Sequence, residues 1–334
     1  MPGSRKHIPV EETVGLIMEG DRGALGRAIT LIESSRPDHQ ETAHNILDSC
    51  LPSPTRSLRI GITGPPGTGK STLIESLGLE ILKNPDNRIA ILAIDPSSER
   101  SGGSILGDKA RMEKLASRKE VYIRPSPSSG YLGGTSPKTH EAILLCEAAG
   151  YNVIIVETVG VGQSEIGIAS MVDYILLLVL PGSGDELQGI KRGIMEIADG
   201  IAVTKIDEAE QKSVHFARAA CESSLKLLQK KYPGWEPRVM LTSAMTGNGI
   251  EELWRNIRFF TDTLKKSGDF EKNRQEQRIR LLRAETDRQL VQAFHNKETV
   301  RSLYPIVASA VEKGNISPFS GAKQLVDTVI RNPR

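Results

Sequence analysis

The sequence is poor in cysteine, since only three occur among 334 residues and they lie far apart in the chain. An odd, widely spaced set predicts neither a disulfide framework nor a cysteine-bound metal site. Free cysteine usually behaves as a small apolar residue. We therefore expect Cys50, Cys146 and Cys221 to be buried, reduced thiols.

Long apolar runs and a strong charge of one sign are also missing. The longest apolar run, Tyr174 to Leu180, is far shorter than the ~20 residues that span a bilayer. Glu11 and Glu12 stand where a signal peptide would carry its apolar stretch, so we expect a cytoplasmic protein without a membrane span. Lys and Arg number 43 against 41 for Asp and Glu, which argues against a nucleic-acid binder built on bulk charge.

Changes of hydrophobic period divide the chain into three expected parts. Residues 1–54 carry apolar side chains at helical spacing, and residues 268–334 do so again. In residues 55–267, short β-branched runs alternate with helical stretches, which indicates an α/β domain whose mostly parallel sheet has helices on both faces. The expected strands are Arg59–Thr63, Ile89–Ile94, Val121–Ile123, Val153–Val156, Ile175–Leu180, Ile201–Val203 and Val239–Thr242.

A glycine-rich segment follows the first expected strand. Its spacing of Gly, four residues and then Gly-Lys-Ser fits the Walker A pattern. The glycines let backbone N–H groups and a helix N-terminus face phosphates, while Lys70 neutralises the phosphate oxygens and the Ser71 hydroxyl ligates Mg²⁺. The sequence therefore predicts a P-loop NTPase fold, with the phosphate-binding residues Gly64, Pro65, Pro66, Gly67, Thr68, Gly69, Lys70, Ser71 and Thr72.

Two later strand ends carry residues that select the base. Thr204, Lys205 and Asp207 occupy the place of the guanine-recognising Asn-Lys-x-Asp pattern. A carboxylate accepts hydrogen bonds from the N1–H and amino groups of guanine, whereas adenine offers an acceptor at N1. After the next strand, Ser243, Ala244 and Met245 match the loop whose backbone N–H contacts the guanine carbonyl. These residues predict GTP and GDP as ligands.

Thr204 departs from the guanine pattern. The pattern has Asn at this position, and the Asn amide usually ties the loop to the phosphate loop. Since Thr has no amide, we expect the substitution to affect nucleotide affinity more than the choice of base.

The strand that ends at Glu157 predicts the hydrolysis machinery. An ordinary GTPase has Asp-x-x-Gly here, with the glycine amide on the γ-phosphate, and this chain has Glu157 and Gly160. The longer Glu157 side chain is expected to reach the metal shell or an attacking water. Because Val161 stands where many GTPases place the water-orienting Gln, we expect slow intrinsic hydrolysis. Gln163 would substitute only if the loop folds back.

Two further carboxylates are candidates for the metal. Asp95 and Asp108 follow the second expected strand and, with Ser71 and Glu157, make up the expected Mg²⁺ set. The alternative for Asp95 is a turn or helix cap before the proline that follows it. The alternative for Asp108 is the N-cap of the next helix.

Five segments together resemble one family, the ArgK/MeaB P-loop GTPases: Gly64–Thr72, Asp95–Ser98, Pro125–Gly130, Glu157–Glu165 and Gly184–Lys191. The Glu-Thr-Val-Gly-Val-Gly-Gln-Ser run that starts at Glu157 is specific to this family. The resemblance covers nearly the whole chain, including the early segment Arg27–Glu33 and the late segment Ile316–Pro318.

The resemblance implies a GTP-dependent chaperone of adenosylcobalamin enzymes, chiefly methylmalonyl-CoA mutase. Such a protein gates cofactor loading and protects or reactivates the mutase. The resemblance also implies a homodimer held through the C-terminal arm. It further implies that Asp185–Lys191 is an additional switch, in which Gln188 and Lys191 approach the γ-phosphate when the mutase is bound and supply what Val161 lacks. A solvated helix face is the alternative for Gln188 and Lys191.

Two other classes of enzyme share the Walker A pattern. A P-loop kinase would pass the γ-phosphate to a small molecule or transport protein and should close an Arg-bearing lid over its acceptor. Residues 274–288 are the candidate lid, although their period predicts a packed helix with a solvated basic face. A nickel-insertion GTPase would need clustered Cys or His, and the six His form no close pair beyond His39 and His44.

Overall fold

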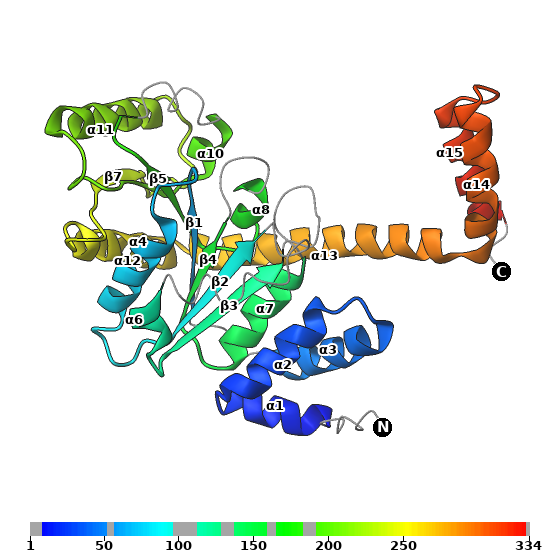
Figure 1. Ribbon diagram of the computed structural model, residues 1–334, viewed down its shortest axis with the longest axis horizontal. Helices are drawn as coiled ribbons and strands as arrows, with labels where there is room; N and C mark the ends of the chain where they lie inside the picture. The colour runs from blue at the N-terminus through cyan, green and yellow to red at the C-terminus, as the bar shows by residue number, and fades with distance from the viewer. Residues whose placement is uncertain are drawn as a thin grey trace. The chain divides into compact units, whose positions relative to one another are not determined.

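A seven-stranded sheet in the order β3-β2-β4-β1-β5-β6-β7 is the centre of the fold (Figure 1). The computed structural model describes residues 9–51, 57–95, 112–127, 137–158, 165–182 and 192–331. Every strand pairing is parallel, so the carboxyl ends of the strands share one edge. The strands are β1 (Leu58–Thr63), β2 (Ile89–Asp95), β3 (Val121–Pro127), β4 (Val153–Glu157), β5 (Tyr174–Val179), β6 (Gly200–Val203) and β7 (Arg238–Leu241).

Helices precede, cover and follow this sheet. Three come before it: α1 (Val10–Met18), α2 (Arg22–Glu33) and α3 (Pro37–Ser49). Those between the strands are α4 (Lys70–Ile81), α6 (Glu113–Ala116), α7 (Pro137–Ala148), α8 (Glu165–Ala169), α10 (Arg192–Ile197) and α11 (Gln211–Lys226). The last are α12 (Ile250–Ser267), α13 (Asp269–Asn296), α14 (Glu298–Glu312) and α15 (Pro318–Arg331). The expected α/β fold with helical segments at both ends is confirmed.

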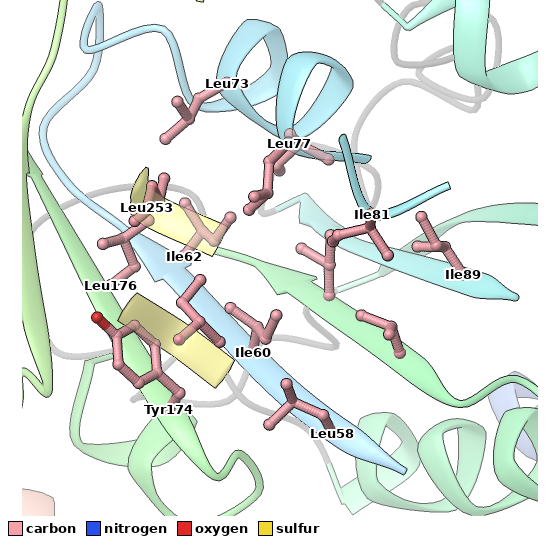
Figure 2. Packing of buried hydrophobic residues seen from close by; sticks show 14 of the residues in the cluster. Leu58, Ile60, Ile62, Leu73, Leu77, Ile81, Ile89, Tyr174, Leu176 and Leu253 are labelled. Atoms are coloured by element: carbon pink, nitrogen blue, oxygen red, sulfur yellow. The ribbon is translucent and has the colours of Figure 1, made fainter. Parts of the chain in front are cut away.

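The two faces of the sheet bury separate apolar layers, because alternate residues of a strand point to opposite faces. Ile60 and Ile62 of β1 pack on one face with residues of α4, α6 and α12. Figure 2 shows Leu73 and Leu77 of α4 over this strand. On the other face, α1–α3, α7 and α8 share a core with β2 and β4, and α10 and α11 cover β5 and β6. The first turn of α4 is thereby fixed at the carboxyl end of β1.

The N-terminal helices are tied to the rest of this layer by polar contacts as well as by apolar packing. The Arg124 guanidinium on β3 donates to the Glu33 carboxylate at the end of α2. Lys138 Nζ on α7 donates to the Glu33 carbonyl at 2.6 Å. Figure 1 shows α1–α3 beside α7. The helical segment therefore packs directly on the sheet domain.

A buried ionic cluster lies at the amino end of the sheet. Arg59 on β1 makes two hydrogen bonds to the Glu147 carboxylate, at 2.7 and 2.8 Å. Arg274 on α13 donates to both oxygens of Asp173, at 2.8 and 2.6 Å, and to the Ser57 carbonyl at 2.9 Å. Arg274 is only 3% exposed, so the solvated basic face that we expected on this packed helix does not include this residue. The cluster joins β1, α7, β5 and α13.

The chain divides into two compact units, one up to Gln275 and one from Glu276 onward. In the second unit α14 and α15 pack together, and Ser317 Oγ accepts a hydrogen bond from the Ser320 N–H at the start of α15. Within α13, Ile279, Leu282 and Leu290 are all more than half exposed in this chain. The expected arm is thus helical, and it carries an apolar stripe.

The structure tests two expectations from the sequence, the state of the cysteines and the lack of a membrane-spanning helix. Cys50, Cys146 and Cys221 are free and buried, as predicted. Burial raises the pKa of the Cys221 thiol to about 11. Across the part of the chain that the structure describes, no helix is both long and apolar enough to span a bilayer.

Candidate nucleotide-binding site

The loop between β1 and α4 takes a backbone conformation that favours glycine at three of its positions, Gly64, Gly67 and Gly69. Gly69 has φ of +80° and immediately precedes α4. Gly64 has φ of +153°, and a Cβ there would lie 2.7 Å from the Leu178 carbonyl oxygen on β5. Side chains at these positions would strain the backbone or push β5 away. The Walker A segment therefore curls tightly at the carboxyl edge of the sheet, and the N-terminus of α4 opens onto it.

Lys70 lies against the loop that precedes it. Its Nζ donates to the carbonyl oxygens of Gly64, at 2.9 Å, and Pro65, at 3.2 Å. Burial lowers the pKa of the Lys70 ammonium from its ordinary value, and the nearby Glu157 carboxylate acts in the opposite direction. A cation and a helix N-terminus at one loop form the electrostatic arrangement that binds phosphate.

Ser71 and Glu157 meet across the edge of the sheet. The Ser71 hydroxyl donates to Glu157 Oε1 at 3.0 Å, although 86 positions separate the two residues. Glu157 ends β4 and is only 9% exposed. A hydroxyl and a carboxylate next to a phosphate loop are oxygen donors of the kind Mg²⁺ prefers. The Ser71 hydroxyl and the Glu157 carboxylate are therefore suitable ligands for a magnesium ion.

For several residues that we expected at the site, the structure describes no side chain. Asp95 ends β2 at the same sheet edge, but only its backbone is described. Asp108, Gly160, Gln188 and Lys191 lie outside the described residues. The helix that contains Leu115 begins at Glu113 with Met112 as its N-cap residue, and because Asp108 lies outside the described residues, both its metal role and its capping alternative stay predictions.

Thr204 connects the base side of the site to the phosphate loop. Its Oγ1 donates to the Thr68 carbonyl at 2.9 Å, and the residue is 4% exposed. The tie that we expected to be lost with the Asn amide is therefore present, because the shorter hydroxyl reaches the same loop. Lys205 has φ of +56°, and its Cε would lie 3.8 Å from a Cβ on Gly69, so its stem runs along the phosphate loop. Asp207 is exposed beside it.

The loop after β7 completes the base side. Ser243 is fully buried, whereas Met245 is exposed. Ser76, in the second turn of α4, donates from Oγ to the Ala244 carbonyl at 2.7 Å. Ser76 could not be recognised from the sequence, because it lies outside the Walker A pattern and its partner is 168 positions away. The phosphate helix thus contacts both the first and the last segment of the site.

The described side chains do not cluster around a further metal. No group of three His, Cys, Asp or Glu residues that could hold a metal ion occurs within the described ranges. His39 Nδ1 lies 2.9 Å from Ser34 Oγ, and His44 faces Glu141 at 4.0 Å. These two histidines therefore have separate partners rather than a shared ligand.

The parallel sheet, the Walker A loop and the two base-side loops define a P-loop GTPase. Comparison with known proteins identifies the family: the one described as "Methylmalonyl Co-A mutase-associated GTPase MeaB" matches residues 25–299. The chain belongs to this MeaB family. It is therefore a GTP-hydrolysing enzyme that binds guanine nucleotides.

The similarity to individual relatives covers nearly the full chain. This chain is 43% identical over 318 residues to "GTPase ArgK" of Escherichia coli K12, and the match covers 95% of this chain and 96% of that protein. It is 41% identical over 320 residues to the "Methylmalonic aciduria type A homolog, mitochondrial" of Mus musculus, covering 93% and 77%. A crystal structure described as "LAO/AO transport system kinase" has a TM-score of 0.74 at 36% identity, covering 98% of this chain and 99% of that one.

Proposed function

We propose that this GTPase is a chaperone of an adenosylcobalamin-dependent mutase, methylmalonyl-CoA mutase or a related acyl-CoA mutase. It would gate the loading of cobalamin and protect or reactivate the mutase. The family description, which names the mutase as the associated enzyme, supports the partner. The observation that carries the nucleotide chemistry is the contact of Ser71 with the buried Glu157 beside the phosphate loop.

The side chains at the site have distinct proposed roles. Lys70 would exchange its two carbonyl contacts for phosphate oxygens. Ser71 and Glu157 would hold Mg²⁺, directly or through its water shell, with Asp95 and Asp108 as further candidates. When bound, Mg²⁺ neutralises charge on the β- and γ-phosphates. Asp207 would pair with the N1–H and amino group of guanine.

Slow intrinsic hydrolysis is part of the proposal. Val161 occupies the position of the water-orienting Gln, and an apolar side chain cannot orient a water. Gly160 would contact the γ-phosphate through its amide. Gln188 and Lys191 would reach the γ-phosphate only when the mutase is bound, so that the partner accelerates turnover.

We also propose a cytoplasmic homodimer formed through the C-terminal arm. The exposed apolar stripe on α13 supports this, because an isolated chain would leave Leu282 and Leu290 in water.

Replacing both leucines by Glu should give a monomer by light scattering, whereas Ala284→Glu, on the opposite side of the helix, should leave the dimer. A dimer that survives the double substitution would refute the arm interface. A variant that deletes the arm should lack only the residues after Gln275, because Arg274 belongs to the buried ionic cluster and its loss would also destabilise the sheet domain.

A kinase is the alternative function, and one solved relative is described as a transport system kinase. The structure disfavours the candidate lid in residues 274–288. Arg274 is held in buried ion pairs with Asp173 and Glu147, and Arg288 pairs with Glu285. Arg274 is therefore held inside the fold, and Arg288 is paired within its own helix.

A cobalamin-loading assay tests the chaperone proposal. Apo mutase, adenosylcobalamin and this protein would be mixed with GTP, GDP or no nucleotide, and mutase-bound cobalamin measured by absorbance. We expect loading to depend on which nucleotide is present, and Lys70→Ala to abolish that dependence. Loading that is identical in all three mixtures would refute the proposal, and phosphate transferred to an added small molecule would favour the kinase.

A further inference from the structure

The hydroxyl of Ser76 bonds differently from those of Ser49, Ser224 and Thr261, which also lie in helices. The hydroxyls of Ser49, Ser224 and Thr261 donate to the carbonyl four residues back in their own helix. That is the usual local bond of Ser and Thr within helices. The half-buried Ser76 hydroxyl instead leaves its helix and donates to the carbonyl of Ala244 at 2.7 Å. The contact joins α4 to the loop that follows β7.

The loop that receives this bond is held from several sides. The Ser243 N–H donates to the Asn248 carbonyl at 2.9 Å, and the Thr246 N–H donates to Ser243 Oγ at 3.1 Å. By contrast, the backbone N–H groups of Ala244 and Met245 have no acceptor among the described residues. These two donors are therefore available to a ligand.

The bond from Ser76 also fixes the direction of one of these donors. The carbonyl of Ala244 and the N–H of Met245 belong to the same planar peptide group and, in a trans peptide, point in opposite directions. Since the carbonyl is held toward α4, the Met245 N–H points away from that helix. The 6-oxo group of guanine accepts hydrogen bonds, whereas adenine has an amino donor at the same position.

We propose that Ser76 is a positioning residue for base selection: by holding the Ala244 carbonyl, it directs the backbone N–H of Met245 toward the 6-oxo group of guanine. This inference rests on the guanine site proposed above. It makes α4 the common support of both ends of the nucleotide, because the same helix carries Lys70 and Ser71 in its first turn.

Base analogues test this role with the full-length protein. GDP carries the 6-oxo and 2-amino groups, inosine diphosphate keeps the 6-oxo group but lacks the 2-amino group, and 6-thio-GDP keeps the 2-amino group but has sulfur, a weak acceptor, at position 6. Dissociation constants would be measured by calorimetry for wild type, Ser76→Ala and Ser76→Thr. Ser224→Ala is the matched control, because its hydroxyl bonds only within its own helix.

We expect Ser76→Ala to weaken GDP and inosine diphosphate by about fivefold each, the loss of one neutral hydrogen bond. Binding of 6-thio-GDP should change less than about twofold. Ser76→Thr should restore GDP binding, and Ser224→Ala should bind all three nucleotides like wild type. An equal loss for all three nucleotides, or no loss for any, would overturn the proposal.

Wild-type affinities for GDP, ADP and 6-thio-GDP separate the guanine site itself from the role of Ser76. If wild type binds GDP no better than ADP, the guanine site itself is refuted, and the role of Ser76 with it. If wild type prefers GDP over both ADP and 6-thio-GDP and Ser76→Ala keeps the same preferences, only the role of Ser76 is overturned.

Discussion

The hydroxyl of Thr204 donates to the carbonyl of Thr68, at 2.9 Å, and so joins the base-binding side of the site to the phosphate loop. Both residues are buried, which shields the bond from water. Together with the Ser76–Ala244 bond, it connects the two halves of the nucleotide site through hydroxyl groups rather than through a side-chain amide.

Removing the Thr204 hydroxyl should weaken nucleotide binding. Thr204→Val keeps the shape but leaves the Thr68 carbonyl without this donor, so we expect GDP to bind about fivefold more weakly. Thr204→Ser keeps the hydroxyl and should stay near wild type. Calorimetric titration with GDP checks this, and wild-type affinity in Thr204→Val would show that the bond does not support the site.

Neutralising Glu157 should impair the use of magnesium. Glu157→Gln keeps the size of the side chain but removes the charge beside Ser71, so we expect half-maximal GTP turnover to need about 10–100-fold more Mg²⁺. The exposed Glu120→Gln is the control. The measurement is GTP turnover over a Mg²⁺ titration, and an unchanged Mg²⁺ requirement would exclude Glu157 from the metal shell.

Arg274→Ala should destabilise the fold strongly. The substitution leaves Asp173 and Glu147 buried with one cationic partner fewer, and breaking a buried ion pair costs about 3–5 kcal/mol in free energy of unfolding. Arg278→Ala on the same helix is exposed and should cost little. Urea denaturation followed by circular dichroism compares the two midpoints. Equal midpoints would show that the cluster does not stabilise the protein.

His140 should make stability depend on pH. Burial lowers the pKa of its imidazole from 6.5 to about 4, and the Arg59 cation acts in the same direction. Between these values the unfolded chain binds a proton that the folded chain does not. The free energy of unfolding should therefore fall as pH decreases, by up to about 3 kcal/mol.

Variants separate His140 from the carboxylates that titrate in the same range. Urea midpoints from pH 7 to pH 4 should fall less steeply for His140→Gln than for wild type, whereas the exposed His215→Gln should keep the wild-type slope. Parallel curves for wild type and His140→Gln would contradict the half-buried, neutral imidazole.

Much of the fold was predictable because its signals are local. Apolar β-branched runs predicted all seven strands, with differences of only a few residues at their ends. For instance, Thr242 lies just beyond β7, although its N–H still donates to the Val203 carbonyl. The Walker A spacing likewise predicted a strand, a tight loop and a helix, since the left-handed backbone at Gly69 is a local requirement for glycine.

Contacts between distant segments could not be predicted in this way. Arg274 pairs with Asp173 across 101 positions, and periodicity within α13 cannot reveal a carboxylate that directly precedes β5. Ser76 and Ala244 are further apart still. The contact of Thr204 with Thr68 could not be predicted for a different reason: a pattern records the type of residue, whereas the bond depends on how closely the two loops approach.

GTP turnover with and without the mutase tests the central claim most directly. The purified protein would be assayed with GTP and with ATP, alone and with an adenosylcobalamin-dependent acyl-CoA mutase from the same source. We predict slow turnover that is selective for GTP and that the mutase accelerates. Fast turnover that no mutase changes, or equal turnover of ATP, would contradict a partner-gated GTPase.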